Sequence, residues 1–280
     1  MSKTSQIIIA IVGVIVLALA GGYFGAGLRS NSGAGATENG AWIKKIKDAG
    51  ELRVCIASAP PMTGEQKDGK MGGPNVLPLQ NLAKEMGVKF TPVPAEWSKM
   101  VSGLQADRFD VGAYLDATSE RSLAIQFTDP VYTYEGVWIV KSDSGIKSTD
   151  DVIKAKKPVA VASGTSYERR VVDLGVDIVN AEAIPQSITA MEAGRAVAAF
   201  GDLPTLADAA QKNKSLKIVR PEPVIFKSDS NYGVSADIDE RSLQVINIAI
   251  QNAKNDGSFQ AALDKAGVIG PDNLGDLEMK

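Results

Sequence analysis

The most informative part of the sequence is the run Phe109-Asp-Val-Gly-Ala-Tyr-Leu115, followed by Thr118-Ser-Glu-Arg121. The first run is strand-like, and the second places an arginine one helical turn beyond the carboxyl end of that strand. Open α/β sheets bind ligands in crevices at the carboxyl ends of their strands. A guanidinium group can hold a carboxylate through two parallel hydrogen bonds. Arg121 is therefore a candidate anion anchor, although a solvated surface residue is the simpler interpretation of an isolated arginine.

Strand and helix patterns alternate on both sides of this segment, which predicts the α/β class. Apolar runs bounded by turn residues predict strands at 53–57, 88–93, 111–115, 137–140, 159–162, 177–179, 197–200 and 216–219. Helical periodicity predicts helices at 42–49, 74–86, 98–106, 167–174, 187–193, 204–212, 240–255 and 259–266. Periodicity alone predicts no particular topology.

Composition narrows the possible functions. The 280 residues carry a net charge of −3, so the chain has no basic surface that would suggest nucleic acid as a partner. The absence of histidine excludes Ser-His and Cys-His nucleophile pairs and histidine-based metal sites, while carboxylate acid–base chemistry stays open. A single cysteine cannot form an internal disulfide. We expect no cofactor and no metal.

The N-terminus predicts export. Residues 7–28 contain no charged side chain, a length that can cross a bilayer as an anchoring helix. The alternative is a cleaved signal with Ala34-Gly-Ala36 as its small-x-small site. We assign residues 1–29 to this anchor or signal segment and residues 30–40, which are rich in Gly, Ser and Ala, to a flexible tether. Either route places the remainder at the periplasmic or extracellular face of the cell envelope.

Several segments together resemble the extracellular solute-binding proteins of ABC transporters for polar amino acids, family 3. They occur in the order that is typical of this family and cover roughly residues 50 to 266. They are Glu51-Leu-Arg-Val54, Trp97 with Leu104 to Asp110, Thr118-Ser-Glu-Arg121 before Phe127-Thr-Asp-Pro130, Val159 to Glu168, Met191-Glu-Ala-Gly-Arg195 with Asp202, and Asn247 with Asp256-Gly-Ser258.

The resemblance implies a two-lobed, periplasmic-binding-protein-like (type II) fold with the ligand in a cleft between the lobes. We expect residues 41–136 and 229–280 to form a discontinuous first lobe and residues 137–228 the second. It also implies a monomeric, non-enzymatic protein that captures an amino acid and delivers it to an ABC transporter permease.

The resemblance assigns roles to residues in the cleft. Arg121 would hold the ligand carboxylate, helped by Gly164, Thr165 and Ser166 at a helix N-terminus, where backbone N–H groups attract anions. Asp202 would hold the α-ammonium group. The simpler alternatives are that Thr165 or a neighbouring serine caps the helix, and that Asp202 caps the helix that follows it.

Four further residues bear on the ligand side chain. Asp116 stands where the family often has a small residue; a second acid in the cleft would suit a ligand with surplus positive charge, such as a basic amino acid. The alternative is that Asp116 pairs with Arg121. Trp97 matches an aromatic position that often packs on the ligand, although it could be a core residue, and Tyr114 could form a second wall. Met62 replaces an aromatic residue of the family pattern, so the side-chain pocket departs from it.

Two other functions are compatible with this scaffold. One is an enzyme that resembles the cyclohexadienyl dehydratases, with Glu168 as the candidate proton donor, although its spacing from Gly164 is one residue longer than expected. The other is a receptor domain that senses a ligand and signals through a partner.

Overall fold

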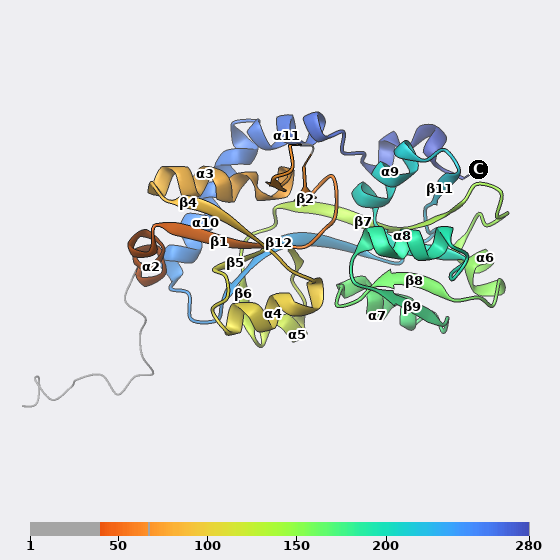
Figure 1. Cartoon of the computed structure of the whole chain (residues 1–280), viewed down its shortest axis with the longest axis horizontal. Coiled ribbons are helices and arrows are strands. Elements are labelled where there is room, and N and C mark those ends of the chain that lie inside the picture. The colour runs from red at the N-terminus through yellow and green to blue at the C-terminus, as the bar shows by residue number, and fades with distance from the viewer. Residues whose placement is uncertain (1–39, 67, 280) are drawn as a thin grey trace, which may run out of the picture. The chain divides into compact units, whose positions relative to one another are not determined.

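The computed structural model describes residues 40–66 and 68–279 (Figure 1). The predicted anchor at 1–29 and all but the last residue of the predicted tether at 30–40 lie outside this range. Within the described range, no helix combines the length and the hydropathy that crossing a membrane requires.

One group of strands and helices is built around the strand that precedes Arg121. Strands β4 (Lys89–Pro94), β1 (Glu51–Ile56) and β5 (Val111–Asp116) are parallel neighbours. β12 (Lys227–Ser235) pairs antiparallel with β5, and β6 (Ile125–Phe127) pairs with β12. The helices of this group are α2 (Ala41–Ala49), α3 (Leu77–Met86), α4 (Trp97–Gln105), α5 (Ser119–Ser122), α10 (Glu240–Asn255) and α11 (Ser258–Ala266). We call this group the first lobe.

The second lobe is built on β7 (Tyr132–Lys141). β10 (Ala198–Asp202) and β11 (Leu216–Val219) pair antiparallel with it, and β8 (Val159–Ala162) and β9 (Ile178–Ala181) continue the sheet beyond β10 in parallel. Its helices are α6 (Thr149–Lys154), α7 (Ser166–Val172), α8 (Ile184–Glu192) and α9 (Leu203–Lys212).

Two long strands, β7 and β12, connect the lobes (Figure 1). The first residues of β7, Tyr132 to Glu135, pair with Lys227 to Ser230 of β12, while the rest of β7 pairs with β10 and β11. The chain thus enters the second lobe along β7 and returns along β12 to pair with β5. The described part of the chain has the predicted two-lobed arrangement. The last residues of the predicted first-lobe segment 229–280 lie on the second lobe instead: Glu278 forms a bridge with Ile218 of β11, and the N–H of Met279 donates to the carbonyl oxygen of Ile218 at 2.7 Å.

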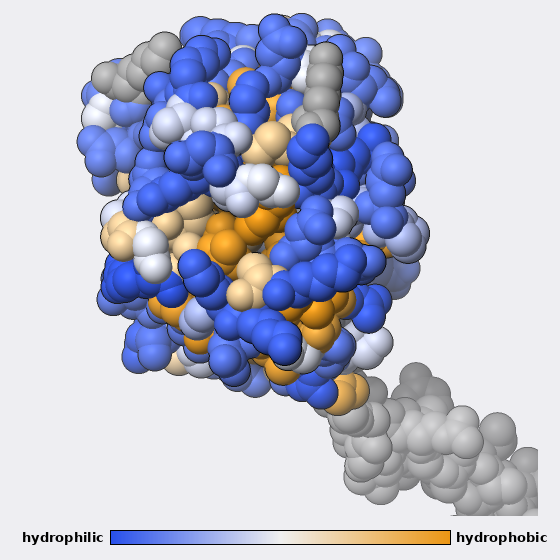
Figure 2. Space-filling view, turned by 90° about the vertical axis from the view of Figure 1, so that its right-hand side faces the viewer, coloured by the Kyte–Doolittle hydropathy of each residue, from blue (hydrophilic) through white to orange (hydrophobic). Residues whose placement is uncertain are grey.

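The core explains why the apolar runs are strands. In the second lobe, Trp138 and Phe200 from neighbouring strands are fully buried and meet edge to face, with ring centroids 4.6 Å apart. Figure 2 shows the end of the molecule where α6 and β11 lie in Figure 1. On this surface, hydrophilic residues surround a smaller apolar area at the centre. Continuous apolar runs are expected where helices cover a parallel sheet.

The structure also contains elements that periodicity did not predict. They are β2 (Gly64–Glu65), β3 (Met71–Gly72), β6, β12, α5, α6 and the 3₁₀ turns at Pro74–Val76, Pro271–Asn273 and Gly275–Leu277. The predicted helix 74–86 was too long as an α-helix, because its first three residues form one of these turns and α3 begins at Leu77. Pro78 in the first turn is compatible with that start, since the first N–H groups of a helix have no intrahelical partner.

Candidate functional site

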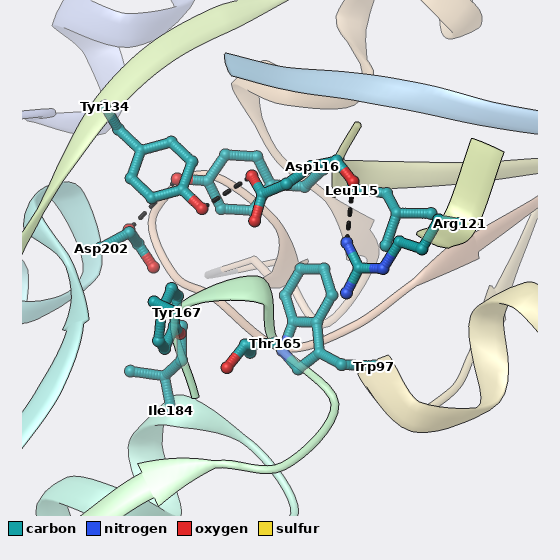
Figure 3. A pocket seen from close by; sticks show the side chains of 10 residues that line it. Trp97, Leu115, Asp116, Arg121, Tyr134, Thr165, Tyr167, Ile184 and Asp202 are labelled. Carbon is teal, nitrogen blue, oxygen red and sulfur yellow. Dashed lines mark hydrogen bonds between the residues drawn. The ribbon is translucent and has the colours of Figure 1, made fainter. Parts of the chain in front are cut away.

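The carboxyl ends of β5 and β10 meet at one pocket between the lobes. Asp116 ends β5 and Asp202 ends β10, and the two residues are only 6% and 1% exposed. The pocket encloses about 250 Å³ when its open mouth is included. It is lined by Trp97, Tyr114, Leu115, Asp116, Arg121, Tyr134, Thr165, Tyr167, Ile184 and Asp202 (Figure 3). Six of the eight site residues predicted from the sequence therefore line one cavity, and Gly164 and Ser166 of the predicted Gly-Thr-Ser turn are not among its lining residues.

One carboxylate oxygen of Asp202 accepts hydrogen bonds within the protein, and the other accepts none from the described residues. Its Oδ1 accepts the N–H of Thr205 at 2.9 Å, which makes Asp202 the N-cap of α9, and also accepts the hydroxyl of Tyr114 at 3.1 Å. Its Oδ2 is buried and accepts no hydrogen bond from any described residue. A buried carboxylate oxygen without a donor is costly, so this atom is the natural acceptor for a cationic group in the pocket.

The electrostatic surroundings of Asp202 differ from those of a surface acid. Burial raises its pKa to about 6; the hydrogen bonds from Thr205 and Tyr114 oppose this rise, and the nearby charge of Asp116 adds to it. The capping role and the predicted ligand role of Asp202 are compatible, because they use different oxygens.

Asp116 uses both carboxylate oxygens within the protein. Oδ1 accepts the hydroxyl of Tyr134 at 2.7 Å, and Oδ2 accepts the hydroxyl of Ser166. Burial raises the pKa of Asp116, while these hydroxyls and the charge of Arg121 lower it. The alternative that the Asp116 carboxylate pairs with Arg121 does not hold, since Arg121 Nη1 donates instead to the main-chain oxygen of Asp116, at 2.8 Å.

Arg121 is held at the cleft by main-chain contacts. It lies in the short helix α5, where the Thr118 side chain accepts the N–H of Arg121 at 3.2 Å. Nη2 donates to the carbonyl oxygen of Gly164 at 2.7 Å, across the cleft. Burial lowers the pKa of Arg121, opposed by the charge of Asp116. A guanidinium has five N–H donors, so two such contacts leave others for a ligand. Figure 3 shows Arg121 and Asp202 on opposite sides of the pocket.

The Gly164-Thr165-Ser166 turn is arranged differently from the simple anion site that its sequence suggested. The N–H of Gly164 is bound by Oε2 of Glu168 at 2.7 Å, because a glutamate at the third helical position can reach back to the start of its helix. Thr165 Oγ1 donates to the carbonyl of Ala162 at 2.7 Å, so Thr165 does not cap α7 with its side chain. Ser166 points to Asp116, as described above.

Aromatic rings form the rest of the wall. Trp97 and Tyr114 have centroids 6.1 Å apart, and Tyr114 and Tyr134 have centroids 5.8 Å apart. Trp97 is buried and also lines the pocket, so it belongs both to the core and to the pocket. Its Nε1 has no hydrogen-bond acceptor among the described residues. Tyr114 has φ of +57°, where a non-glycine residue is strained. Such strain is often found at binding sites.

Sequence reasoning missed Tyr134, Tyr167, Leu115 and Ile184 as pocket residues. Tyr134 stands two residues beyond Tyr132 of the Pro130-Val-Tyr segment, on the same face of β7, and of these two residues Tyr134 is the one that lines the pocket. Tyr167 directly follows the Gly164-Thr-Ser turn, which was the one available signal. Strand and helix periodicity do not distinguish a residue that faces the cleft from one that faces the core.

Comparison with known proteins identifies relatives for nearly all of the described chain. Residues 52–267 match the family model of the bacterial extracellular solute-binding proteins, family 3. The chain is 30% identical over 229 residues to the L-cystine-binding protein TcyJ of Escherichia coli (strain K12), which covers 80% of this chain and 85% of that protein.

Solved structures agree with this result. The ancestral amino acid-binding protein AncCDT-1, a precursor of cyclohexadienyl dehydratase, has a TM-score of 0.72 and 28% identity, covering 80% of this chain and 98% of that one. The arginine-bound form of truncated ArgBP from T. maritima has a TM-score of 0.69 and 26% identity, covering 75% of this chain and 99% of that one. These relatives are binding proteins.

Proposed function

Because the chain belongs to the bacterial extracellular solute-binding proteins of family 3, we propose that it captures an amino acid and delivers it to the permease of an ABC transporter. The observation that carries the proposal is the free, buried Oδ2 of Asp202 in the same pocket as the guanidinium of Arg121. A zwitterion needs a carboxylate for its ammonium group and a cation for its own carboxylate. Charge-assisted bonds to both groups strengthen when water is excluded.

We propose further that the ligand carries a second cationic group. The pocket lining contains two acids, Asp116 and Asp202, and one arginine, Arg121. The hydroxyl groups of Tyr134 and Ser166 donate hydrogen bonds to Asp116. These hydrogen bonds favour the ionised form of Asp116, and its negative charge acts on the pocket. A dibasic amino acid suits such a pocket better than an acidic amino acid does, whereas cystine would bring a second carboxylate with its second ammonium group. The arginine-bound structure of ArgBP from T. maritima supports this ligand class.

We propose that the protein is not an enzyme. The candidate proton donor of the dehydratase-like alternative, Glu168, accepts the N–H of Gly164 and does not line the pocket. The relatives reported above are binding proteins, which supports the same conclusion.

In transport, closure of the lobes would be the signal that the permease reads, and bound ligand would stabilise the closed form. We propose that residues 41–136 with 229–270, and residues 137–228 with the C-terminal residues that pair with β11, move as the two lobes, hinged at β7 and β12. The protein would act as a monomer outside the cytoplasmic membrane, held there by the segment before residue 30 if that segment is retained.

A thermal-shift screen against the twenty amino acids, L-cystine, putrescine and prephenate tests this function. At a hundred times its dissociation constant, a ligand adds about 2.7 kcal/mol to the free energy of unfolding. We expect a rise in melting temperature with at least one amino acid and none with prephenate. A shift with prephenate alone would favour the dehydratase-like alternative and contradict the proposal.

Asp116 should favour cationic ligands. We expect L-arginine, L-lysine or L-ornithine to bind at least tenfold more tightly than L-glutamate, a difference of about 1.4 kcal/mol. A second ligand carboxylate would face the charges of both Asp116 and Asp202. In Asp116→Ser the gap should shrink, measured by isothermal titration of the four amino acids. Tight binding of glutamate by the wild type would show that the charge of Asp116 does not act on the ligand.

A further inference from the structure

The two lobes touch each other directly at the pocket, through protein groups alone. Ser166, the first residue of α7 in the second lobe, donates its hydroxyl hydrogen to Oδ2 of Asp116 at the end of β5 in the first lobe. Arg121 of the first lobe donates from Nη2 to the carbonyl oxygen of Gly164 in the second lobe, at 2.7 Å. These two hydrogen bonds cross the cleft side by side, and the Tyr114 hydroxyl makes a third, to Oδ1 of Asp202 in the second lobe, at 3.1 Å.

The backbones also approach closely at this place. Gly164 has φ of +78°, and a Cβ atom added to it would lie 2.6 Å from N and 2.7 Å from Cα of Ser98, at the start of α4 in the first lobe. Contacts that short do not occur between real Cβ atoms and a backbone, so only glycine permits this approach. The turn before α7 is therefore seated against the first lobe.

Both carboxylate oxygens of Asp116 accept hydrogen bonds from protein hydroxyl groups, one of them across the cleft, and do not face the open part of the pocket unpaired. Tyr134 and Ser166 each donate to one of its oxygens, whereas Asp202 keeps Oδ2 free. Asp116 is 6% exposed, so its hydrogen bonds form in a site with little water, where bonds to a charged acceptor are strongest. The volume that the centre of a water molecule can reach inside the pocket is about 10 Å³, enough for roughly one water molecule, whereas the 250 Å³ given above also includes open solvent at the mouth.

We propose that Asp116 and Ser166 form a latch between the lobes. The latch stabilises the closed conformation by the same amount whatever ligand is inside, because its two groups bind each other. The latch rests on the proposed function in one respect, which is that the measured affinity for a ligand includes the free energy of closing the lobes. Ser166 therefore changes the affinity for every ligand by the same factor, whereas the charge of Asp116 also influences which ligand is preferred.

The first test measures closure without any ligand. Spin labels at the exposed positions Gln105 and Asp173, introduced as Gln105→Cys and Asp173→Cys, report the distance between α4 and the end of α7 in the full-length protein. Adding Ser166→Ala should shift the distance distribution to longer values, and Ser163→Ala, which removes a hydroxyl of the same turn that makes no cross-lobe bond, should not. An unchanged distribution in Ser166→Ala would overturn the latch.

The second test measures affinity for L-arginine, L-lysine and L-cystine by isothermal titration. Ser166→Ala should raise the dissociation constant of every amino acid that the wild type binds by the same factor, about tenfold, since a hydrogen bond to a charged acceptor is lost on closing. A change in their order of affinity would mean that Ser166 contacts the ligand side chain and would overturn the proposal. If none of the three binds the wild type, the proposed preference for a cationic ligand fails, while the distance measurement still decides the latch.

Discussion

Arg121→Ala is expected to abolish binding of the amino-acid ligand while the protein stays folded. Arg121 is the one cation among the described residues that line the pocket, and it would hold the ligand carboxylate. Truncating one partner of a desolvated, charge-assisted pair costs about 2–5 kcal/mol, or roughly thirtyfold or more in affinity. Isothermal titration of the folded variant measures this loss, with circular dichroism as the check on folding.

Arg121 also bonds Gly164 across the cleft, so its removal could weaken binding through the lobes alone. The pair L-arginine and L-argininamide separates the two effects, because the amide lacks the carboxylate charge. If Arg121 acts on the ligand carboxylate, Arg121→Ala should weaken L-arginine far more than L-argininamide. Equal losses for both compounds would assign Arg121 to lobe closure and place the carboxylate anchor elsewhere.

Asp202→Asn is expected to weaken ligands with a free α-ammonium group much more than analogues without one. The substitution keeps the shape of the side chain, and asparagine remains a good N-cap for α9, so the free energy of unfolding should change little. It removes the negative charge of the oxygen that has no partner. The expected loss is again about 2–5 kcal/mol, measured by titration of each ligand and its deaminated analogue. Equal losses for both would leave Asp202 with the capping role alone.

The same residue should make binding depend on pH. The carboxyl of Asp202 has a pKa of about 6 in the folded protein, so it is ionised at pH 7.5 and protonated below pH 6. Because only the ionised form attracts an ammonium group, the affinity should fall as the pH is lowered from 7.5 to 5. In Asp202→Asn this dependence should largely disappear, and a profile unchanged from the wild type would assign the pH effect to another group.

Much of the fold could be predicted from periodicity. The predicted bounds of β8, β11 and α10 coincide with the observed ones, because each is a run with one clear period and polar or turn residues at its ends. The hairpin β2–β3 was missed because its strands are two residues long, and α6 because its six residues are largely polar. Such short elements form because neighbouring segments hold them in place, so their own hydrophobic pattern does not predict them.

The site could be predicted only in part. Arg121 and Asp202 follow strand ends, which is a signal that sequence carries. The partnership of Asp116 with Ser166 is not encoded locally, since the two residues are 50 positions apart and meet only where the lobes touch. The same holds for Tyr114, whose hydroxyl reaches an aspartate 88 positions away in the other lobe.

In the proposed function, Arg121 holds the carboxylate of an amino acid and Asp202 holds its ammonium group. Isothermal titration of the wild type at pH 7.5 with two matched pairs, L-arginine with agmatine and L-lysine with cadaverine, tests this claim, because each amine lacks only the α-carboxylate. We expect at least one of the amino acids to bind, and its decarboxylated counterpart to bind at least about thirtyfold more weakly. Equal affinity within a pair, or binding of the amines alone, would contradict the claim.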